Sequence, residues 1–414
     1  MDTSTTTSTL KIACPGCGAS LTYQSGTSEM TCGYCQCNVP LPDQPVLGDS
    51  LESGLEELLS LQDSDPLPEQ KMLSCRSCGA TTSVEGQRIT GRCAFCASEM
   101  VAERMSSPNQ VAPTALIPFK IDRTQSTHAF RNWAGSLWFR PNALRNLAKV
   151  SGIEGIYVPF WTFDAKSHTQ WSAERGDFYY EEESYTDSEG KTQTRQVKKT
   201  RWSPCSGDHR SHFDDVLICA SKGLSEDLLR RVEPFNTKTG LVPFDAKFLA
   251  GWLAEEYALG PKDGWVKGKE EIQERERLNC IDIVPGDTHR NLTLATKLDN
   301  ITWKHVLLPV WVAAYQYKGK SFRFLVNGET GEVSGESPLS WFKILGLLIL
   351  YFLLVLLVVS GLSDSSALGV FASSVMVTGF SVFAVGTPIA LSHLYRSRDK
   401  SHRAIYEFYQ QIRS

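Results

Sequence analysis

The sequence CPGCGA at residues 14–19 returns as CRSCGA at residues 75–80, 61 positions later. In each copy, fourteen residues separate this first Cys-x2-Cys pair from a second one. The eight cysteines concerned are Cys14, Cys17, Cys32 and Cys35, then Cys75, Cys78, Cys93 and Cys96. This recurrence indicates an internal duplication, and the spacing is typical of a four-cysteine metal site.

These cysteines predict two structural Zn²⁺ ions as cofactors. Two Cys-x2-Cys turns at the ends of a short hairpin can direct four sulfurs at one ion and leave no coordination position open. A unit of about thirty residues buries too little apolar surface to fold alone, so the bound metal would supply the missing stability. Disulfides and redox-active pairs are the alternatives, and iron in a rubredoxin-like site is the chemical competitor.

The other four cysteines fall outside this pattern. Cys37 lies two residues past Cys35, where Gln36 replaces the usual glycine, and it either substitutes as a ligand or is a bystander thiol. Cys205, Cys219 and Cys280 have no partner at metal-ligand spacing, so we expect ordinary buried or half-buried side chains.

Composition sets broad limits on the protein. The chain has 414 residues, of which 42% are hydrophobic and 21% charged, and this ordinary globular composition excludes wholesale disorder. The net charge of −4, from 42 basic and 46 acidic residues, argues against a whole-chain polyanion binder. Twelve cysteines are too few for a disulfide scaffold of this length.

Two uncharged stretches near the C-terminus predict a membrane anchor. Residues 344–363 and 367–391 carry no charge, and twenty helical residues span about 30 Å, the thickness of a bilayer core. The short link between them predicts a two-helix transmembrane hairpin over residues 343–394. Basic residues flank this pair, so the positive-inside bias predicts a bacterial inner-membrane location with both termini in the cytoplasm. The basic, aromatic tail at residues 395–414 could also contact anionic membrane lipid.

The sequence therefore predicts a multidomain fold, with two small four-cysteine zinc ribbons, a β-rich α+β body and a C-terminal transmembrane helical hairpin. The first ribbon covers residues 11–40 and the second residues 71–105. The remaining predicted parts are a disordered N-terminus at 1–10, an acidic linker with a short amphipathic helix at 41–70, the body at 111–338, and the cytoplasmic tail at 395–414.

Within the body, strands are predicted at residues 115–121, 157–165, 306–317 and 321–326, and a long exposed hairpin at 177–185 and 192–202. Helices are predicted at residues 126–133, 142–149, 245–257 and 267–277. The segment LIPF at 116–119 resembles LVPF at 241–244, and YVPFW at 157–161 resembles LLPVW at 307–311. These two similarities, in the same order along the chain, indicate a diverged duplication.

Residues 208–215, DHRSHFDD, are the best candidate for an acid/base or metal cluster. A strand at this position would place His209 and His212 on opposite faces, which argues against a joint site. DTH at 287–289 is a weaker candidate, and the sequence contains no phosphate-binding loop of the form G-x4-GK[ST]. We therefore expect that the protein is not an enzyme.

The chain is similar to a bacterial family of membrane-anchored double zinc-ribbon proteins, whose members often carry labels such as primosomal protein N-prime (replication factor Y)-like or TFIIB-type zinc ribbon protein. The similarity covers nearly the whole chain and rests on CPGCGA, CRSCGA, LIPFKI, LWFRPN, YVPFWTFDA, ERGDFYY, TRW, FDDVL, HVLLPVW and FLVNGETGEV. The resemblance implies a partner in a membrane-stress system, of the flotillin-like (SPFH) or phage-shock type. Because the nucleotide-binding motifs of a helicase are missing, the helicase label reflects the ribbons alone.

Two functions remain as hypotheses. The first is a non-enzymatic, membrane-anchored adaptor or scaffold that presents a cytoplasmic surface to partner proteins. The alternative is a nucleic-acid-associated zinc-ribbon factor, an accessory of replication or transcription that is tethered to the membrane. The first ribbon has one lysine against one glutamate, and the second has five basic and three acidic residues. Neither offers the clustered cations that phosphate contacts need, so the sequence argues against the alternative.

Overall fold

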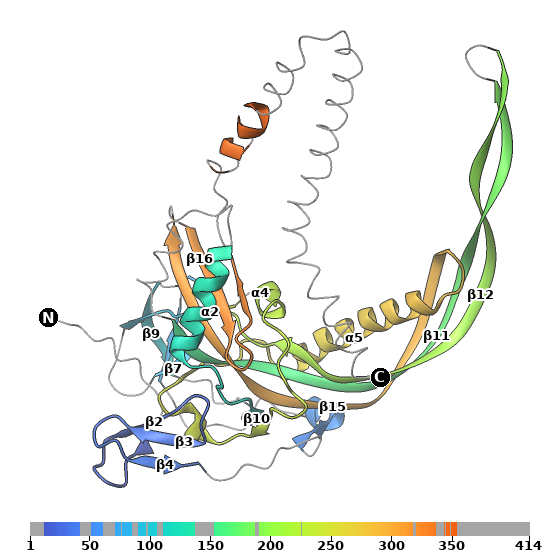
Figure 1. Cartoon of the computed structure of the whole chain (residues 1–414). Coiled ribbons are helices and arrows are strands. Elements are labelled where there is room, and N and C mark those ends of the chain that lie inside the picture. The colour runs from blue at the N-terminus through green and yellow to red at the C-terminus, as the bar shows by residue number, and fades with distance from the viewer. Residues whose placement is uncertain are drawn as a thin grey trace.

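The computed structural model describes residues 12–41, 51–60, 71–75, 77–84, 90–96, 98–105, 111–136, 153–186, 190–224, 226–317, 320–336, 343, 345–347 and 349–353. These residues form three β-sheets and a few helices (Figure 1). Two sheets are small and contain the cysteine pairs, and the third is a large sheet with nine strands. The predicted β-rich body is confirmed.

The two small sheets are each antiparallel and four-stranded, and we call them ribbon 1 and ribbon 2. Ribbon 1 consists of β1 (Ile12–Ala13), β2 (Ser20–Tyr23), β3 (Glu29–Cys32) and β4 (Asn38–Pro40). Ribbon 2 consists of β6 (Lys71–Ser74), β7 (Thr81–Val84), β8 (Thr90–Arg92) and β9 (Glu99–Met105). β7 and β8 begin 61 residues after β2 and β3, so the sequence repeat is also a structural one.

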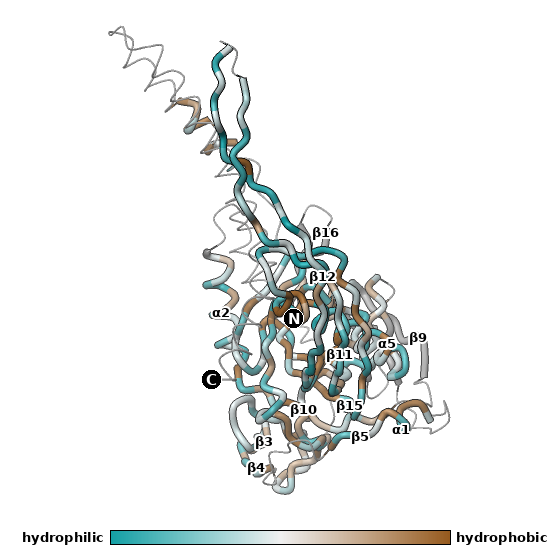
Figure 2. The backbone as a smooth tube through the Cα atoms, turned by 90° about the vertical axis from the view of Figure 1, so that its right-hand side faces the viewer, coloured by the Kyte–Doolittle hydropathy of each residue, from teal (hydrophilic) through white to brown (hydrophobic). Residues whose placement is uncertain are grey.

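The large sheet is built around three long antiparallel strands in the order β12-β11-β15. These are β11 (Glu154–Thr186), β12 (Thr192–Cys219) and β15 (Thr288–Tyr317). Its short strands are β5 (Ser53–Gly54), β10 (Ala115–Leu116), β13 (Val242–Pro243), β14 (Leu253–Ala254), β16 (Lys320–Asn327) and β17 (Val333–Gly335). β15 pairs with β11 as far as Gly176, which lies opposite Thr288. Past Gly176, β11 and β12 continue as a twisted, mostly hydrophilic two-stranded arm (Figures 1 and 2). The predicted hairpin is therefore confirmed.

Three β-bulges bend the long strands. The pairing of β11 shifts around Asp164 against both neighbours, and again between Ser172 and Glu174 against β15. The partner strands carry a residue with positive φ at each shift, Asp215 (50°), Asn300 (51°) and Asn291 (54°). Asp and Asn tolerate this left-handed conformation better than other non-glycine residues, so they place the bends.

The first third of β11 is buried on both faces of the sheet. Ile156 and Val158 pack in one apolar cluster with Cys75 of ribbon 2, whereas Tyr157 packs in another with Cys14 of ribbon 1. The two ribbons therefore contribute to the cores on opposite faces of the same sheet. This double burial explains why this part of the sequence is a continuous apolar run rather than an alternating one.

The helices are α1 (Leu55–Ser60), α2 (Arg123–Ser136), α4 (Glu226–Arg230), α5 (Pro261–Ile283) and the 3₁₀ helix η2 (Ala246–Leu249). The helices predicted at 126–133 and 267–277 lie within α2 and α5 and are confirmed. In the linker, α1 buries Leu58 beside Trp161 and Phe163, so this predicted amphipathic helix packs on the large sheet and not on a ribbon.

Two predictions for the body are corrected. The strand expected at 115–121 is only β10, because the N–H groups of Lys120 and Ile121 both donate to the Gly328 carbonyl instead of continuing the pairing with β15. The helix expected at 245–257 is replaced by η2 and β14, because the Ala250 carbonyl and the backbone of residues 253–256 pair with the ribbons and with β11. The helix predicted at 142–149 and the N-terminus at 1–10 lie outside the described residues.

In the part of the chain that the structure describes, no helix is both long enough and apolar enough to cross a membrane. This finding corrects the prediction of two transmembrane helices over residues 343–394 and of the inner-membrane location with cytoplasmic termini that rested on it. Hydropathy registers only how apolar a stretch is, whereas a span needs about 20 residues in one helix. From residue 345 on, the described helical residues are 345–347 and 349–353. Residues 367–391 and 395–414 lie outside the described residues.

Candidate metal centres

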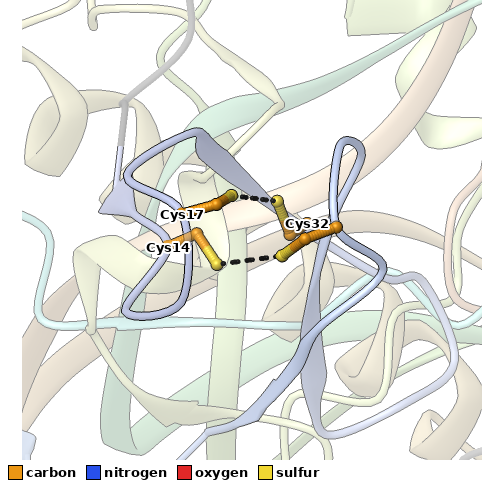
Figure 3. Close-up of side chains that lie close together, drawn as sticks. Cys14, Cys17 and Cys32 are labelled. Carbon is orange, nitrogen blue, oxygen red and sulfur yellow. Dashed lines mark hydrogen bonds between the residues drawn. The ribbon is translucent and has the colours of Figure 1, made fainter.

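In ribbon 1, two turns bring four sulfurs together. Cys14 and Cys17 flank the turn after β1, Cys32 ends β3, and Cys35 lies in the turn that follows. The Cys14 and Cys35 sulfurs are 3.5 Å apart, and those of Cys17 and Cys32 are 3.6 Å apart. Figure 3 shows the side chains of Cys14, Cys17 and Cys32 pointing toward one another from facing loops.

Ribbon 2 repeats this geometry. The equivalent sulfurs of Cys75 and Cys96 are 3.4 Å apart, and those of Cys78 and Cys93 are 3.6 Å apart. In each ribbon the four sulfurs lie within 4.8 Å of one another. The sequence prediction that these eight cysteines form two groups of four is therefore matched by two clusters that could hold a metal ion.

The sulfur arrangement fits a metal ion of zinc size. Sulfurs bound tetrahedrally at about 2.3 Å from Zn²⁺ lie about 3.8 Å from one another. The four short sulfur–sulfur distances, 3.4–3.6 Å, are slightly smaller than this value. No disulfide bond joins these sulfurs, because all twelve cysteines are free thiols.

Hydrogen bonds favour the thiolate at three of the eight cysteines, whereas burial and the neighbouring thiols raise the pKa of Cys17, Cys35, Cys75 and Cys93. The N–H of Gly16 donates to the Cys14 sulfur (3.4 Å), and this contact lowers the pKa of Cys14. Hydrogen bonds from the N–H groups of Cys35 and Tyr34 lower the pKa of Cys32 to about 6. In ribbon 2, a hydrogen bond from Cys93 lowers the pKa of Cys78 to about 5. The thiolate is the form that binds metal.

The glycine after each first pair turns the chain away from the site. Gly18 and Gly79 have φ values of 73° and 78°, and their N–H groups donate to the carbonyls of Cys14 and Cys75. Gln36 takes the same left-handed conformation after the second pair of ribbon 1, with φ 59°. The motif thus survives the replacement of its glycine. Cys37 is half-buried and does not belong to the four-sulfur group.

Both ribbons are fastened to one segment of the body, residues 250–256, which we call the docking segment. The Tyr23 N–H of ribbon 1 donates to the carbonyl of Ala250 (2.8 Å), and the indole N–H of Trp252 donates back to the Tyr23 carbonyl (3.1 Å). At the other end, the N–H of Glu256 donates to the Thr81 carbonyl of ribbon 2 (3.1 Å). Between them, β14 pairs with β11, so the segment joins both cysteine sites to the large sheet.

The candidate cluster at 208–215 is split between the two faces of β12. His212 is exposed and His209 is half-buried, as the alternation of a strand predicts. Asp214 pairs with Lys238 (3.1 Å), and Asp215 pairs with Lys304 (2.9 Å). The second candidate, at 287–289, is structural as well, because the Asp287 carboxylate accepts a hydrogen bond from the N–H of Phe178 (2.7 Å) at the base of the arm.

Asp215 belongs to a buried network around Lys304, whose side chain is 5% exposed. The Lys304 ammonium also contacts Glu52 (3.2 Å), and the Thr302 hydroxyl bridges Glu52 and Asp164. Burial raises the pKa of Asp164 to about 7, and the nearby charges of Asp215 and Glu52 add to this rise. Lys304 supplies the positive charge of this network. Because Glu52 belongs to the linker and the other charged members belong to β11, β12 and β15, the network connects the linker to the three long strands.

The structure also joins His209 to two residues that the sequence did not single out for chemistry. Its Nδ1 lies 2.9 Å from the Oε1 of Glu276, and Cys280 lies within reach of both. Cys280 is buried and Cys205 and Cys219 are half-buried, as predicted. A signal for Glu276 was present in the sequence, since Gly264, Gly268, Ile272, Glu276 and Cys280 recur every four residues and form the buried stripe of α5. A carboxylate in such a stripe is unusual.

No family model matches the chain, and no solved structure matches it. A curated protein of Bacillus subtilis (strain 168), the uncharacterized protein YdjG, is 29% identical over 338 residues. The match covers 80% of this chain and 91% of that protein. Since the match is far longer than the two ribbons together, it also includes much of the body.

Proposed function

We propose that each four-cysteine cluster binds a structural Zn²⁺ ion and that the chain is a non-enzymatic adaptor, which binds a partner protein through the second turn of ribbon 1. Four sulfurs fill a tetrahedral site, so the ion would have no open position for a substrate and would serve the fold. An all-sulfur tetrahedron also accepts iron, which the metal analysis described below distinguishes.

The observation that carries the adaptor proposal is a difference between two equivalent aromatic residues. Phe95 of ribbon 2 is 1% exposed and packs in the core of the body with Ala80 and Leu224. The fit is tight, because a Cβ atom on Gly223 would lie 2.8 Å from the Phe95 ring. Tyr34 stands at the same position of ribbon 1, 61 residues earlier, and is 83% exposed.

The same difference extends to the cysteines around these side chains. Cys93 and Cys96, on either side of Phe95, are buried, whereas Cys35 beside Tyr34 is exposed, as is Cys17. The second turn of ribbon 2 is thus occupied by the body of its own chain, and the equivalent turn of ribbon 1 faces solvent. A large exposed aromatic side chain on a rigid turn is suited to anchor a protein interface.

Charge favours a protein over a nucleic acid as the partner. Residues 12–41 contain no Lys, Arg or His, and Lys11 is the one cation of the first ribbon, so this ribbon offers little to a phosphate backbone. The aromatic ring of Tyr34 and the two exposed cysteines supply apolar and polarisable surface instead.

Site-specific photo-cross-linking in the native cell tests this proposal. A photoreactive residue at position 34 should yield a discrete adduct with one partner protein, and flotillin-like and phage-shock-type proteins are the first to look for by mass spectrometry. The matched control is position 266, because Val266 on α5 is 56% exposed. The same adducts from both positions, or none from position 34, would overturn the proposal.

A further inference from the structure

A third cluster of ligand-type side chains lies apart from the ribbons, between α5 and the large sheet. Glu276 and Cys280 occupy one face of α5, four residues apart, and both side chains are fully buried. His209 reaches them from β12, with its side chain 22% exposed. One ligand atom from each of the three residues lies within 4.8 Å of the other two.

The helix is held close to the sheet at this point. A Cβ atom on Gly264 would stand 2.6 Å from the Trp161 ring, and one on Gly268 would stand 2.5 Å from the Phe163 ring. The same stripe of α5 continues into Glu276 and Cys280, so these side chains are pressed onto the strands without room to turn toward solvent. Cys280 also packs in an apolar cluster with Trp171 and Ala173.

Glu276 is incompletely paired. Its Oε1 lies 2.9 Å from the Nδ1 of His209, and its Oε2 is buried without a partner at hydrogen-bond distance. The hydroxyls of Thr169 and Ser211 also interact with this carboxylate, at longer range. A buried carboxylate oxygen without a partner is costly, and a bound cation is one of the few groups that compensates it. This unpartnered atom therefore points to a ligand that completes the cluster.

The arrangement does not suit a nucleophile relay. The Ser211 hydroxyl lies 3.3 Å from the same Nδ1 atom that contacts Glu276. A serine or cysteine relay needs the nucleophile and the carboxylate on different ring nitrogens, because the histidine must pass a proton from one side to the other. Here Ser211 and Glu276 contact the same nitrogen of His209, so the site is suited to hydrogen bonding or metal binding and not to a relay.

We propose that His209, Glu276 and Cys280 form a third metal site, which binds a divalent transition ion of the Zn²⁺ class. Imidazole nitrogen, carboxylate oxygen and thiolate sulfur are the ligand types that zinc takes in proteins. Three protein ligands leave one coordination position, so this ion differs from the ribbon ions in being able to bind water. Binding releases the thiol proton of Cys280 to solvent.

The other non-ribbon cluster of acidic residues, Asp164, Asp214 and Asp215, is a poorer cation site. The Lys304 ammonium already lies 2.9 Å from Asp215 and fills the role of the cation. Among the residues that the structure describes, the basic side chain in contact with Glu276 is His209.

Metal counting on the full-length chain tests the site. The chain and its variants are dialysed without oxygen against excess Zn²⁺, cleared of unbound ion, and analysed for zinc per chain by plasma mass spectrometry. The wild type should hold three ions, and His209→Ala and Cys280→Ser should each hold two. His212→Ala, which removes the exposed histidine on the opposite face of β12, should hold three.

The ribbon ions show that the ribbons of a variant have folded, and urea unfolding of each variant, compared with the wild type, shows whether the body has folded as well. If His209→Ala or Cys280→Ser loses more than one ion, the near-isosteric variant Glu276→Gln is measured instead. Two zinc ions per chain in Glu276→Gln would support the third site, and three would contradict it. A wild type with two ions, or a third ion that survives both His209→Ala and Cys280→Ser, would overturn the proposal. A wild type with one ion that disappears in His209→Ala would support this site and contradict zinc in the ribbons.

Discussion

Gly251 of the docking segment lies so close to Thr22 of ribbon 1 that a Cβ atom built on it would stand 2.3 Å from the Thr22 Cγ2 atom. Gly251 also has φ 85°, a conformation that residues with side chains rarely adopt. The neighbouring Trp252 and Ala250 both hydrogen-bond to Tyr23, so this glycine sits where ribbon 1 is attached to the body.

Gly251→Ala should therefore loosen ribbon 1. The left-handed backbone and the overpacking together should lower the free energy of unfolding by about 2–4 kcal/mol. Gly135→Ala is the control, because a Cβ there meets nothing within 4 Å inside α2 and alanine favours a helix. Urea unfolding of both variants measures the effect. Equal stability of the two variants would contradict the claim that ribbon 1 is attached to the body at Gly251.

The pair Phe95 and Tyr34 predicts opposite outcomes for the same substitution. Phe95→Ala removes a ring that is 1% exposed and should cost about 3–5 kcal/mol of unfolding free energy. Tyr34→Ala removes a ring that is 83% exposed and should change stability by less than about 0.5 kcal/mol, while it weakens binding of the partner. A large loss of stability in Tyr34→Ala would show that this ring serves the fold instead.

Gln36→Gly should stabilise the protein. Gln36 has φ 59°, and its N–H donates to the carbonyl of Cys32 as that of Gly18 does to Cys14. The left-handed conformation costs a non-glycine residue about 1–2 kcal/mol, and the greater freedom of glycine in the unfolded chain offsets part of the gain. We expect a net increase of about 0.5–1 kcal/mol by thermal unfolding in the metal-loaded state. Gly18→Ala should lower the stability. A loss of stability in Gln36→Gly would refute the idea that the left-handed conformation of Gln36 is costly.

Glu255→Gln should change how stability depends on pH. Glu255 is 4% exposed, and burial raises its pKa to about 7, above the ordinary value of 4.5. Because the unfolded chain ionises first, the wild type loses stability relative to the variant as the pH rises from about 4.5 to 7, and the difference stays constant above that. The advantage of the variant should reach about 1–3 kcal/mol at pH 8. Denaturant unfolding at several pH values measures this difference, and a constant difference from pH 5 to 8 would contradict the raised pKa.

The cysteine clusters could be predicted from the sequence because their geometry is local. Two Cys-x2-Cys turns and a hairpin of fixed length are enough to bring Cys14 and Cys35 together, whatever the rest of the chain does. The long arm was predictable for the same reason, since its two strands are separated by five residues of sequence and pair with each other along the arm.

Long-range pairing explains what the sequence did not reveal. The segment at 245–257 has apolar residues at helical spacing, but Leu253 pairs with Ile156 of β11, and this contact outweighs the local preference. The similar segments at 157–161 and 307–311 turn out to pair with each other, with Val158 opposite Leu308. The proximity of His209 to Glu276 depends on how α5 lies on the sheet, which no local pattern specifies.

We expect the eight ribbon cysteines to bind two zinc ions, one in each ribbon. Zinc content and X-ray absorption at the zinc edge, measured on the full-length His209→Ala chain, test it most directly, because that variant lacks the proposed third site. The expected result is two zinc ions per chain, each surrounded by four sulfurs at about 2.3 Å. A chain without metal, with iron in place of zinc, or with nitrogen or oxygen ligands in the first shell would contradict it.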